Sequence, residues 1–380
     1  MSGLRGPDSS RDAQLLDNAV FPETVDVNIR QLDPIPAPRY FLKEIPLTDE
    51  MSDLVLKSRQ EIRDVLNGKD DRLLAIVGPC SIHDPKAAHE YAAKLAAVKK
   101  ELEDRLVIVM RVYFEKPRTT IGWKGLINDP DLDGQFNIRK GMWLARKVLA
   151  DVLSLGLPAA TEWLDPITPQ YICDLISWGA IGARNTESQV HRELASGMSM
   201  PIGFKNATDG SVKPAADSCF AAAFEHHFLS INLDGRVISA ETKGNPDCHL
   251  VLRGSSHGPN YDTESVAKAL SDLKVSKASG PSEHGIVIDA AHGNCGKNEV
   301  REAEVIENIA SRIAAGEQGI SGIMMESFLK AGNQKPAPLD QLEYGKSITD
   351  AACRGNVPNS CCARLPKRSK TAASLSNNRE

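Results

Sequence analysis

The sequence predicts an α/β protein built as a (β/α)8 barrel, and three observations lead to this prediction. Short, continuous apolar runs recur along the chain, segments with helical periodicity separate most of them, and an ionisable residue follows each run. Continuous rather than alternating apolar runs are typical of parallel strands that are buried on both faces. Eight runs in 380 residues fit one TIM barrel with extensions.

The eight predicted strands follow one another at intervals that leave room for a helix or a long loop. They are Leu73–Val77, Leu106–Met110, Pro158–Thr161, Ala180–Ala183, Pro201–Phe204, Leu250–Leu252, Gly285–Ile288 and Ile320–Met325.

Helix signals stand between several of these runs. Asp84 followed by Pro85 is typical of an N-cap with a proline in the first turn. A second helix is predicted to begin at Thr168-Pro169 and to end at Gly179. An apolar stripe at helical spacing supports the first helix, and its members are Tyr91, Leu95, Val98 and Leu102. A second stripe predicts a third helix, and its members are Val305, Ile306, Ile309 and Ile313.

Three segments fall outside the repeating units. Residues 1–70 form an N-terminal extension that contains one amphipathic helix, Asp49–Leu66, and is expected to serve regulation or oligomerisation. The Gly-, Pro- and Asp-rich segment Glu115–Phe136 predicts a long loop over the active face. Phe228–His249 alternates in two arms around Asp234-Gly235, which predicts an inserted β-hairpin.

The end of the chain departs from the barrel pattern. The barrel itself is expected to occupy residues 71–352, and its eighth helix should then follow. Residues 353–380 instead form a basic, Ser-rich tail without an apolar stripe of helical period. The eighth helix is therefore predicted to be missing or altered, and the tail to be disordered or poorly packed.

Composition excludes several classes of protein. Apolar residues make up 41% and charged residues 25%, values of an ordinary globular protein rather than a disordered or collagen-like one. No run approaches the ~20 apolar residues that span a bilayer, and Met1–Asn18 has no apolar central region of a secretory signal. The eight cysteines include no CxxC pair, which favours reduced thiols and a cytoplasmic location.

Charge is divided unevenly between the body and the tail. The net charge is −5, and residues 351–380 carry six basic residues and one acid, so the tail is +5 and the remainder is −10. A net-acidic body argues against a general nucleic-acid or anionic-membrane surface. It still allows a small, strongly basic pocket.

Catalytic groups of such barrels lie at the carboxyl ends of the strands, where the βα loops converge. The ionisable residues at or just after the predicted strands are Cys80, Arg111, Glu162, Arg184, Lys205, Arg253, Asp289 with His292, and Glu326. Four of them are cations, and Lys116 and Arg118 of the long loop add two more. Converging cations that recognise phosphate and carboxylate oxygens predict phosphorylated ligands, more than one of them. The alternative is that some of these cations pair with surface acids.

A second set of strand-end residues has mixed sulfur, nitrogen and oxygen donors: Cys80, His292, Glu326 and Asp350. Their local spacing does not reveal a metal site, and a buried thiol or a hydrogen-bonded loop histidine would explain two of them. Barrel closure makes strands seven, eight and one neighbours, so these side chains can meet. The set is therefore a candidate metal site.

Several long motifs resemble those of the type I 3-deoxy-D-arabino-heptulosonate 7-phosphate (DAHP) synthases, over roughly residues 25–352. They are residues 78–84 (GPCSIHD), 110–120 (MRVYFEKPRTT), 122–125 (GWKG), 182–184 (GAR), 203–206 (GFKN), 252–254 (LRG), 292–294 (HGN) and 345–350 (GKSITD). The resemblance implies a metal-dependent barrel that condenses phosphoenolpyruvate with erythrose 4-phosphate at the start of the shikimate route. It also implies feedback inhibition by an aromatic amino acid and a homodimer or homotetramer.

The resemblance assigns a role to each matching residue. It implies that Cys80, His292, Glu326 and Asp350 bind a divalent metal ion, which is Mn, Fe, Co or Zn. Phosphoenolpyruvate is assigned to Arg111, Arg184, Lys205 and Arg253, with Glu162 beside its reacting carbon, and erythrose 4-phosphate to Lys116, Pro117, Arg118 and Thr119. Lys116 and Lys205 are the candidate proton donors. An effector pocket is expected at Thr168, Pro169, Gln170 and Ser199.

Two departures and two alternatives accompany the resemblance. Ala291 stands where the family commonly has serine before the metal histidine, and the tail replaces the family's final helix.

One alternative is the related synthase that condenses phosphoenolpyruvate with arabinose 5-phosphate. The 116–120 loop and the N-terminal extension argue against this alternative. The other is a catalytically impaired barrel that only binds an aromatic amino acid. The intact Arg111, Lys205, His292 and Glu326 argue against it.

Overall fold

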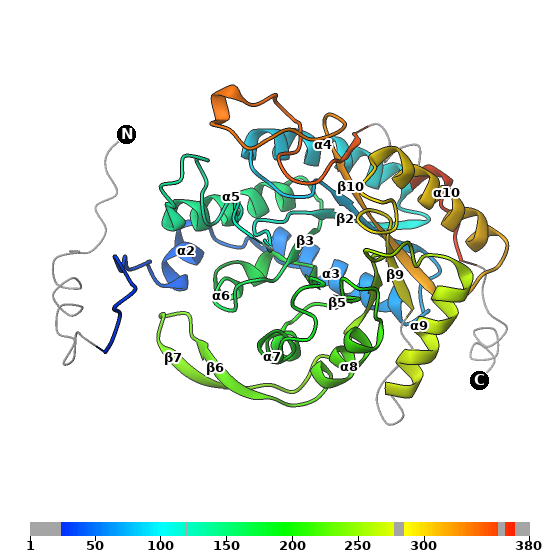
Figure 1. Cartoon of the computed structure of the whole chain (residues 1–380), viewed down its shortest axis with the longest axis horizontal. Helices are drawn as coiled ribbons and strands as arrows, with labels where there is room; N and C mark the ends of the chain where they lie inside the picture. Colours follow the sequence, from blue (N-terminus) through cyan, green and yellow to red (C-terminus); the bar gives the residue numbers. More distant parts are fainter. Residues whose placement is uncertain (1–23, 119, 277–284, 356–361, 369–380) are drawn as a thin grey trace.

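Eight parallel strands close into a barrel in the computed structural model, which describes residues 24–118, 120–276, 285–355 and 362–368 (Figure 1). The strands are β1 (Leu73–Gly78), β2 (Leu106–Arg111), β3 (Ala159–Glu162), β4 (Trp178–Ile181), β5 (Ile202–Lys205), β8 (His249–Leu252), β9 (Ile286–Asp289) and β10 (Ile320–Phe328). Each pairs with the next, and β10 returns to β1 with Leu74 opposite Gly322. The predicted (β/α)8 class is confirmed.

Helices lie between the strands and cover the outside of the barrel. They are α4 (Pro85–Leu102), α5 (Ile138–Ser154), α6 (Pro169–Ile172) with the 3-10 turn η1 (Cys173–Leu175), α7 (Gln189–Gly197), α8 (Lys213–Ala222), α9 (Thr263–Ser276) and α10 (Glu299–Ala314). The Asp84 carboxylate accepts hydrogen bonds from the backbone N–H groups of Lys86 and Ala87, as predicted for an N-cap. None of the helices in the described residues is long and apolar enough to cross a membrane.

The helix predicted to begin at Thr168-Pro169 is much shorter than expected, so its predicted length is wrong. The segment from Thr168 to Gly179 holds only α6 and η1, and β4 begins at Trp178, two residues before the predicted strand. The Arg59 side chain donates hydrogen bonds to the carbonyl oxygens of Cys173 and Ile176. These tertiary contacts satisfy carbonyl groups that a continuing helix would have bonded internally.

The amino end of the barrel is closed by the extension. Its helix α3 (Asp49–Leu66) has the predicted bounds and begins at the N-cap Thr48. Ile62, Val65 and Leu66 are buried in one cluster with inward-facing strand residues such as Leu74 and Met324. A shorter helix, α2 (Pro38–Glu44), precedes it and was not predicted. Because α3 fills the amino end, the carboxyl ends of the strands are left to form the site.

The predicted hairpin consists of β6 (His227–Ile231) and β7 (Val237–Glu241), which pair antiparallel. Gly235 has a φ of +74° in the turn, a conformation that glycine adopts without strain. Arg39 of α2 forms an ion pair with Asp234 at this turn. The hairpin tip is thereby linked to the N-terminal extension.

The described part of the tail packs against the barrel. The two-residue strand β11 (Cys353–Arg354) pairs with the end of β10, and both Cys362 and Leu365 are buried. Arg368 donates a hydrogen bond to the Val65 carbonyl. The prediction of a poorly packed tail is therefore wrong for 353–355 and 362–368, while 356–361 and 369–380 lie outside the described residues. After β10, the described helical segments are η2 (Leu339–Gln341) and one turn at 362–364, so none is a full eighth helix.

Candidate active site

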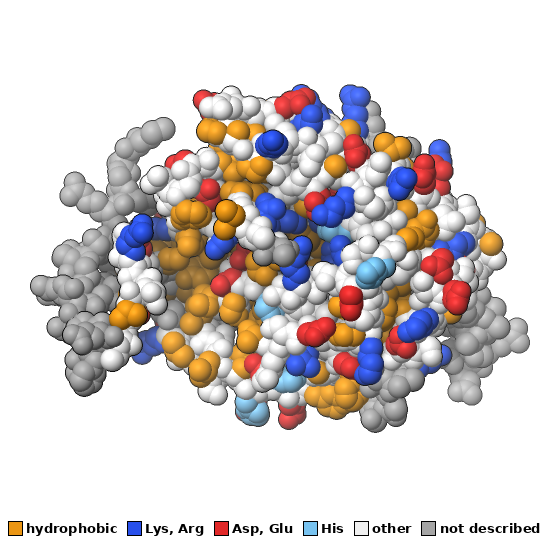
Figure 2. Space-filling model, in the orientation of Figure 1, with side chains coloured by type: hydrophobic (Ala, Val, Ile, Leu, Met, Phe, Trp, Pro, Cys, Tyr) orange, Lys and Arg blue, Asp and Glu red, His pale blue; other side chains and the backbone are white. Residues whose placement is uncertain are grey.

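A cavity of about 290 Å³ opens at the carboxyl ends of the strands. The predicted residues that line it are Lys116, Pro117, Arg118, Glu162, Arg184, Lys205, Arg253, His292 and Asp350. Figure 2 shows Lys and Arg side chains gathered around the hollow near the centre of this face. Residues that come from loops far apart in the sequence thus meet in one strongly basic pocket.

Arg111 lies beneath this pocket rather than in its lining. Its guanidinium group is fully buried, donates a hydrogen bond of 2.9 Å to Glu326 Oε1 and stacks 4.1 Å from the centre of the Tyr113 ring. Burial alone would lower the pKa of Arg111, but Tyr113, Glu326 and Asp289 raise it. Arg111 therefore stays charged and balances the buried carboxylate.

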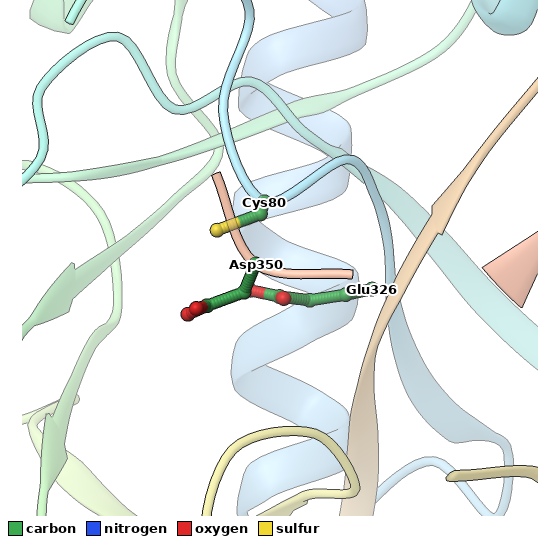
Figure 3. Close-up of side chains that lie close together, drawn as sticks. All are labelled: Cys80, Glu326 and Asp350. Carbon is green, nitrogen blue, oxygen red and sulfur yellow. The ribbon is translucent and has the colours of Figure 1, made fainter. Parts of the chain in front are cut away.

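Three of the four predicted metal ligands form a compact group (Figure 3). One donor atom each of Cys80, Glu326 and Asp350 lies within 4.8 Å of the others, and the three side chains come from the loop after β1, from β10 and from the loop after β10. His292 stands at the edge of the group, with Nε2 3.7 Å from Glu326 Oε1. A thiol, two carboxylates and an imidazole are donors that divalent zinc and first-row transition metals accept.

Two members of the metal group are buried, the third is partly exposed, and cations lie beside all three. Cys80 and Glu326 are buried, and Lys116 Nζ lies 3.2 Å from Cys80 Sγ. Burial and the neighbouring Glu326 raise the pKa of the Cys80 thiol, whereas Lys116 lowers it. Burial would also raise the pKa of Asp350, but His292, Lys116 and Lys297 hold it below its usual value. A largely buried set of two carboxylates and a thiol, which can ionise when a metal ion binds, fits a divalent cation.

Asp289, at the end of β9, joins two of the predicted site residues. Its Oδ2 atom lies 2.8 Å from Lys205 Nζ and 3.0 Å from His292 Nδ1. Its Oδ1 atom accepts a hydrogen bond from the backbone N–H of Ala291. Burial would raise the pKa of Asp289, but Lys205, His292 and Arg111 hold it well below the usual range.

His292 has a φ of +54°, which is uncommon for a residue other than glycine. The turn is held by hydrogen bonds from Lys297 N to His292 O and from the Asn294 side chain to the Asp289 carbonyl. A left-handed residue that its surroundings fix in this way is typical of functional sites.

Glu162 lines the cavity, and the buried Glu115 lies close enough to it for their charges to interact. A Cβ atom at Gly182 would lie 2.1 Å from Glu162 Oε1, so a larger residue there would displace this carboxylate from its present position. Glu115 is buried, and burial together with Asp165 and Glu162 raises its pKa to about 8. Glu115 is therefore mostly protonated at neutral pH and adds little charge beside Glu162.

Four other polar residues line the cavity without a role predicted from the sequence: Thr120, Thr208, Lys297 and Thr349. Lys297 Nζ lies 3.7 Å from Asp350 Oδ1. Lys297 follows His292 by five residues in the same loop, so a search of that whole loop for cations would have found it.

The four predicted effector residues do not share one described cavity. Thr168 and Pro169 are buried, Gln170 is half-buried and Ser199 is exposed. Near them in the sequence, another cavity of about 290 Å³ is lined by residues that include Pro166, Leu194 and Phe228. Thr119, the last predicted substrate residue, lies outside the described residues.

Comparison with known proteins identifies relatives of the whole barrel. Residues 45–360 match the sequence model of the DAHP synthetase I family. The Phe-sensitive phospho-2-dehydro-3-deoxyheptonate aldolase of Escherichia coli K12 is 51% identical over 326 residues, which cover 86% of this chain and 92% of that protein. The Trp-sensitive enzyme of Enterobacter agglomerans is 49% identical over 328 residues, 86% of this chain and 93% of its own.

A solved structure extends this similarity to the fold. The phospho-2-dehydro-3-deoxyheptonate aldolase of Francisella tularensis SCHU S4 superimposes with a TM-score of 0.86 at 46% sequence identity. The alignment covers 89% of this chain and 97% of that one.

Proposed function

The chain belongs to the DAHP synthetase I family, and we propose that it condenses phosphoenolpyruvate with D-erythrose 4-phosphate to form DAHP and inorganic phosphate. This reaction opens the shikimate route to the aromatic amino acids. The observation that carries the proposal is one basic cavity, with cations for two phosphorylated substrates, that reaches the group of metal donors at Asp350 and His292.

The substrates are assigned to opposite sides of this cavity. Arg184, Lys205 and Arg253 are proposed to bind the phosphate and carboxylate of phosphoenolpyruvate, with Arg111 beneath them. Lys116, Pro117, Arg118 and Thr119 are proposed to bind erythrose 4-phosphate. Forked guanidinium groups and a lysine suit these anions, which supports the assignment.

Cys80, His292, Glu326 and Asp350 are proposed to hold a divalent metal ion, which would supply Lewis-acid polarisation of the erythrose 4-phosphate aldehyde. The chain's own residues then orient the bond-forming step. C3 of phosphoenolpyruvate attacks the aldehyde carbon, and positive charge develops at C2.

Glu162 is proposed to stabilise that charge and to orient the water that adds to C2, and Lys116 or Lys205 to donate the proton that the aldehyde oxygen takes up. Phosphate leaves by cleavage of its bond to C2. The closeness of Glu162 to Gly182 in the cavity wall supports this position for the carboxylate.

The purified protein, loaded with Mn²⁺, tests the proposal in a phosphate-release assay with phosphoenolpyruvate and either aldose phosphate. We expect phosphate release with erythrose 4-phosphate and little with arabinose 5-phosphate. The reverse preference would identify the related arabinose 5-phosphate synthase. Metal binding and aromatic amino acid binding without turnover would identify a catalytically impaired barrel.

The phosphate-binding assignment makes a kinetic prediction. Loss of a charge-assisted hydrogen bond costs ~1.5–3 kcal/mol, or roughly 10- to 150-fold in affinity. Arg118→Ala should therefore raise the KM for erythrose 4-phosphate by this factor and leave that for phosphoenolpyruvate nearly unchanged. Arg184→Ala should raise the KM for phosphoenolpyruvate by this factor and leave that for erythrose 4-phosphate nearly unchanged. Each variant is therefore the control for the other. Equal effects on both substrates would contradict the assignment.

We also propose that an aromatic amino acid inhibits the enzyme from a pocket built from the N-terminal extension, the Thr168–Gln170 helix start and the Gly197–Met200 loop. The Phe- and Trp-sensitive relatives support inhibition of this kind. Gly197 lies against Phe228 of the hairpin, and the loop leads into β5 and Lys205. A ligand there would shift β5 and couple the two sites by ~1–3 kcal/mol.

Because Ser199 is exposed, Ser199→Phe should occupy the proposed effector space beside the Gly197–Met200 loop without disturbing the core. We expect the half-inhibitory concentration of the effective amino acid to rise at least ~10-fold, with kcat within about twofold of the wild type. Phenylalanine, tyrosine and tryptophan are tested in parallel, and Ser199→Ala is the control. Unchanged inhibition in the Phe variant would place the pocket elsewhere.

The N-terminal extension is proposed to mediate assembly into a homodimer or homotetramer. Residues 24–37 extend away from the barrel beside α2 (Figure 1), and Val25, Val27 and Ile29 expose apolar side chains at alternate positions. Exposed apolar side chains in this arrangement favour pairing with another surface. The proposed location is the cytoplasm, on the cysteine pattern alone.

A further inference from the structure

The buried carboxylate of Asp289 contacts one residue of the proposed metal site and one residue of the proposed phosphoenolpyruvate site. We propose that Asp289 is a positioning residue that holds His292 for the metal and Lys205 for phosphoenolpyruvate at the same time. The part that concerns Lys205 rests on the proposed function, whereas the part that concerns His292 rests on the donor group alone.

The contact with His292 fixes the direction of the imidazole ring. Nδ1 lies 3.0 Å from Asp289 Oδ2, within ion-pair distance although without the alignment of a hydrogen bond, and Nε2 points to the other side, 3.7 Å from Glu326 Oε1. A carboxylate at Nδ1 favours a proton on that nitrogen and leaves the Nε2 lone pair available to a metal ion. Asp289 thus favours the nitrogen that faces Glu326 of the donor group.

The contact with Lys205 restrains a flexible cation. The Lys205 side chain is 5% exposed and its Nζ lies 2.8 Å from the same Oδ2 atom. An ammonium group with so little access to water needs an anionic partner to remain charged. Asp289 supplies this partner at the wall of the cavity, so that Lys205 meets an incoming anion in one position.

Asp289 is itself held rigidly. Its side chain is fully buried, Oδ1 accepts the Ala291 N–H, and its carbonyl accepts a hydrogen bond from Asn294. No other carboxylate in the described residues is within ion-pair distance of Lys205. Loss of the Asp289 charge should therefore affect both neighbours together.

Asp289→Asn tests this inference because it removes the charge and keeps the shape. Titration calorimetry measures the Kd of the metal-free protein for Mn²⁺ and the Kd for phosphoenolpyruvate at saturating Mn²⁺, without the second substrate. Loss of a carboxylate behind a metal histidine typically weakens metal binding 10–100-fold, and we expect a change of about this size for both ligands. Co²⁺ absorption spectra of the wild type and the variant report the altered donor set independently of turnover.

Asp247→Asn is the matched control, because Asp247 is also buried and paired with a cation, Arg63, but precedes β8 at the other end of the barrel. It should leave both Kd values unchanged. A change in only one of the two Kd values, or in neither, would overturn the proposed double role. If the wild type binds Mn²⁺ but not phosphoenolpyruvate, the proposed function fails, while the Mn²⁺ comparison still decides the role toward His292. Thermal unfolding of each variant shows that it is folded.

Discussion

Cys80→Ala is expected to abolish divalent metal binding and to lower activity by more than ~100-fold while the barrel stays folded. The thiol is fully buried in the donor group with Glu326 and Asp350, and its thiolate would supply both a ligand atom and a negative charge. Substitution of a residue that hydrogen-bonds to a metal ligand already lowers metal affinity or activity 10–100-fold, so removal of the ligand itself should lower them further. Metal content after dialysis and the phosphate-release rate measure the two effects.

Cys219→Ala is the control for this variant. Cys219 is a buried thiol on α8, in the apolar core outside the metal donor group, so its truncation should leave metal content and rate near those of the wild type. Full activity of Cys80→Ala with bound metal would remove Cys80 from the proposed ligands. An unfolded variant would instead lose the far-ultraviolet spectrum of the barrel.

Strand positions could be predicted because strands of a closed parallel barrel are buried on both faces. Leu73–Val77 and Leu106–Met110 are continuous apolar runs for this reason, and each observed strand extends only one residue further. The segment after Thr168 could not be predicted, because Tyr171, Ile172 and Leu175 are apolar at helical spacing. Only the distant Arg59, which bonds Cys173 and Ile176, explains why the helix ends early.

The position of the candidate site at the strand ends could be predicted, but which of its residues line the cavity and which lie below it could not. The rule that catalytic groups lie at strand ends correctly placed Lys205, Arg253 and His292 in one cavity. It could not show that Arg111 lies below the cavity against Glu326, since that depends on the direction of the side chain within the barrel. Side chains shared between two partners, as at Asp289, leave no periodic signal in the sequence.

The tail could not be predicted from composition. Cys362 and Leu365 are buried although the surrounding residues are basic and polar, because two apolar side chains are enough to pack against the barrel. Arg368 then reaches the Val65 carbonyl at the end of α3. These are tertiary contacts between segments that lie about 300 residues apart.

Arg146→Met is expected to lower the stability of the protein by ~3 kcal/mol, because it removes a buried cation and leaves its acceptors without donors. Arg146 lies on α5, its side chain is fully buried, and it donates two hydrogen bonds to the Asp174 carboxylate. It also donates to the carbonyl oxygens of Ile45 and Tyr171. Ile45 follows α2, so this guanidinium group is one of the contacts that hold the N-terminal extension on the barrel.

Lys140→Met provides the comparison, because Lys140 lies on the same helix and its ion pair with Asp131 is exposed. Exposed pairs contribute ~0–1 kcal/mol, so the midpoint of thermal unfolding should fall clearly for Arg146→Met and hardly for Lys140→Met. In Arg146→Met the extension should also become more sensitive to proteolysis near Ile45, because the hydrogen bond from Arg146 to the Ile45 carbonyl is lost. Equal midpoints for the two variants would show that Arg146 does not hold the extension in place.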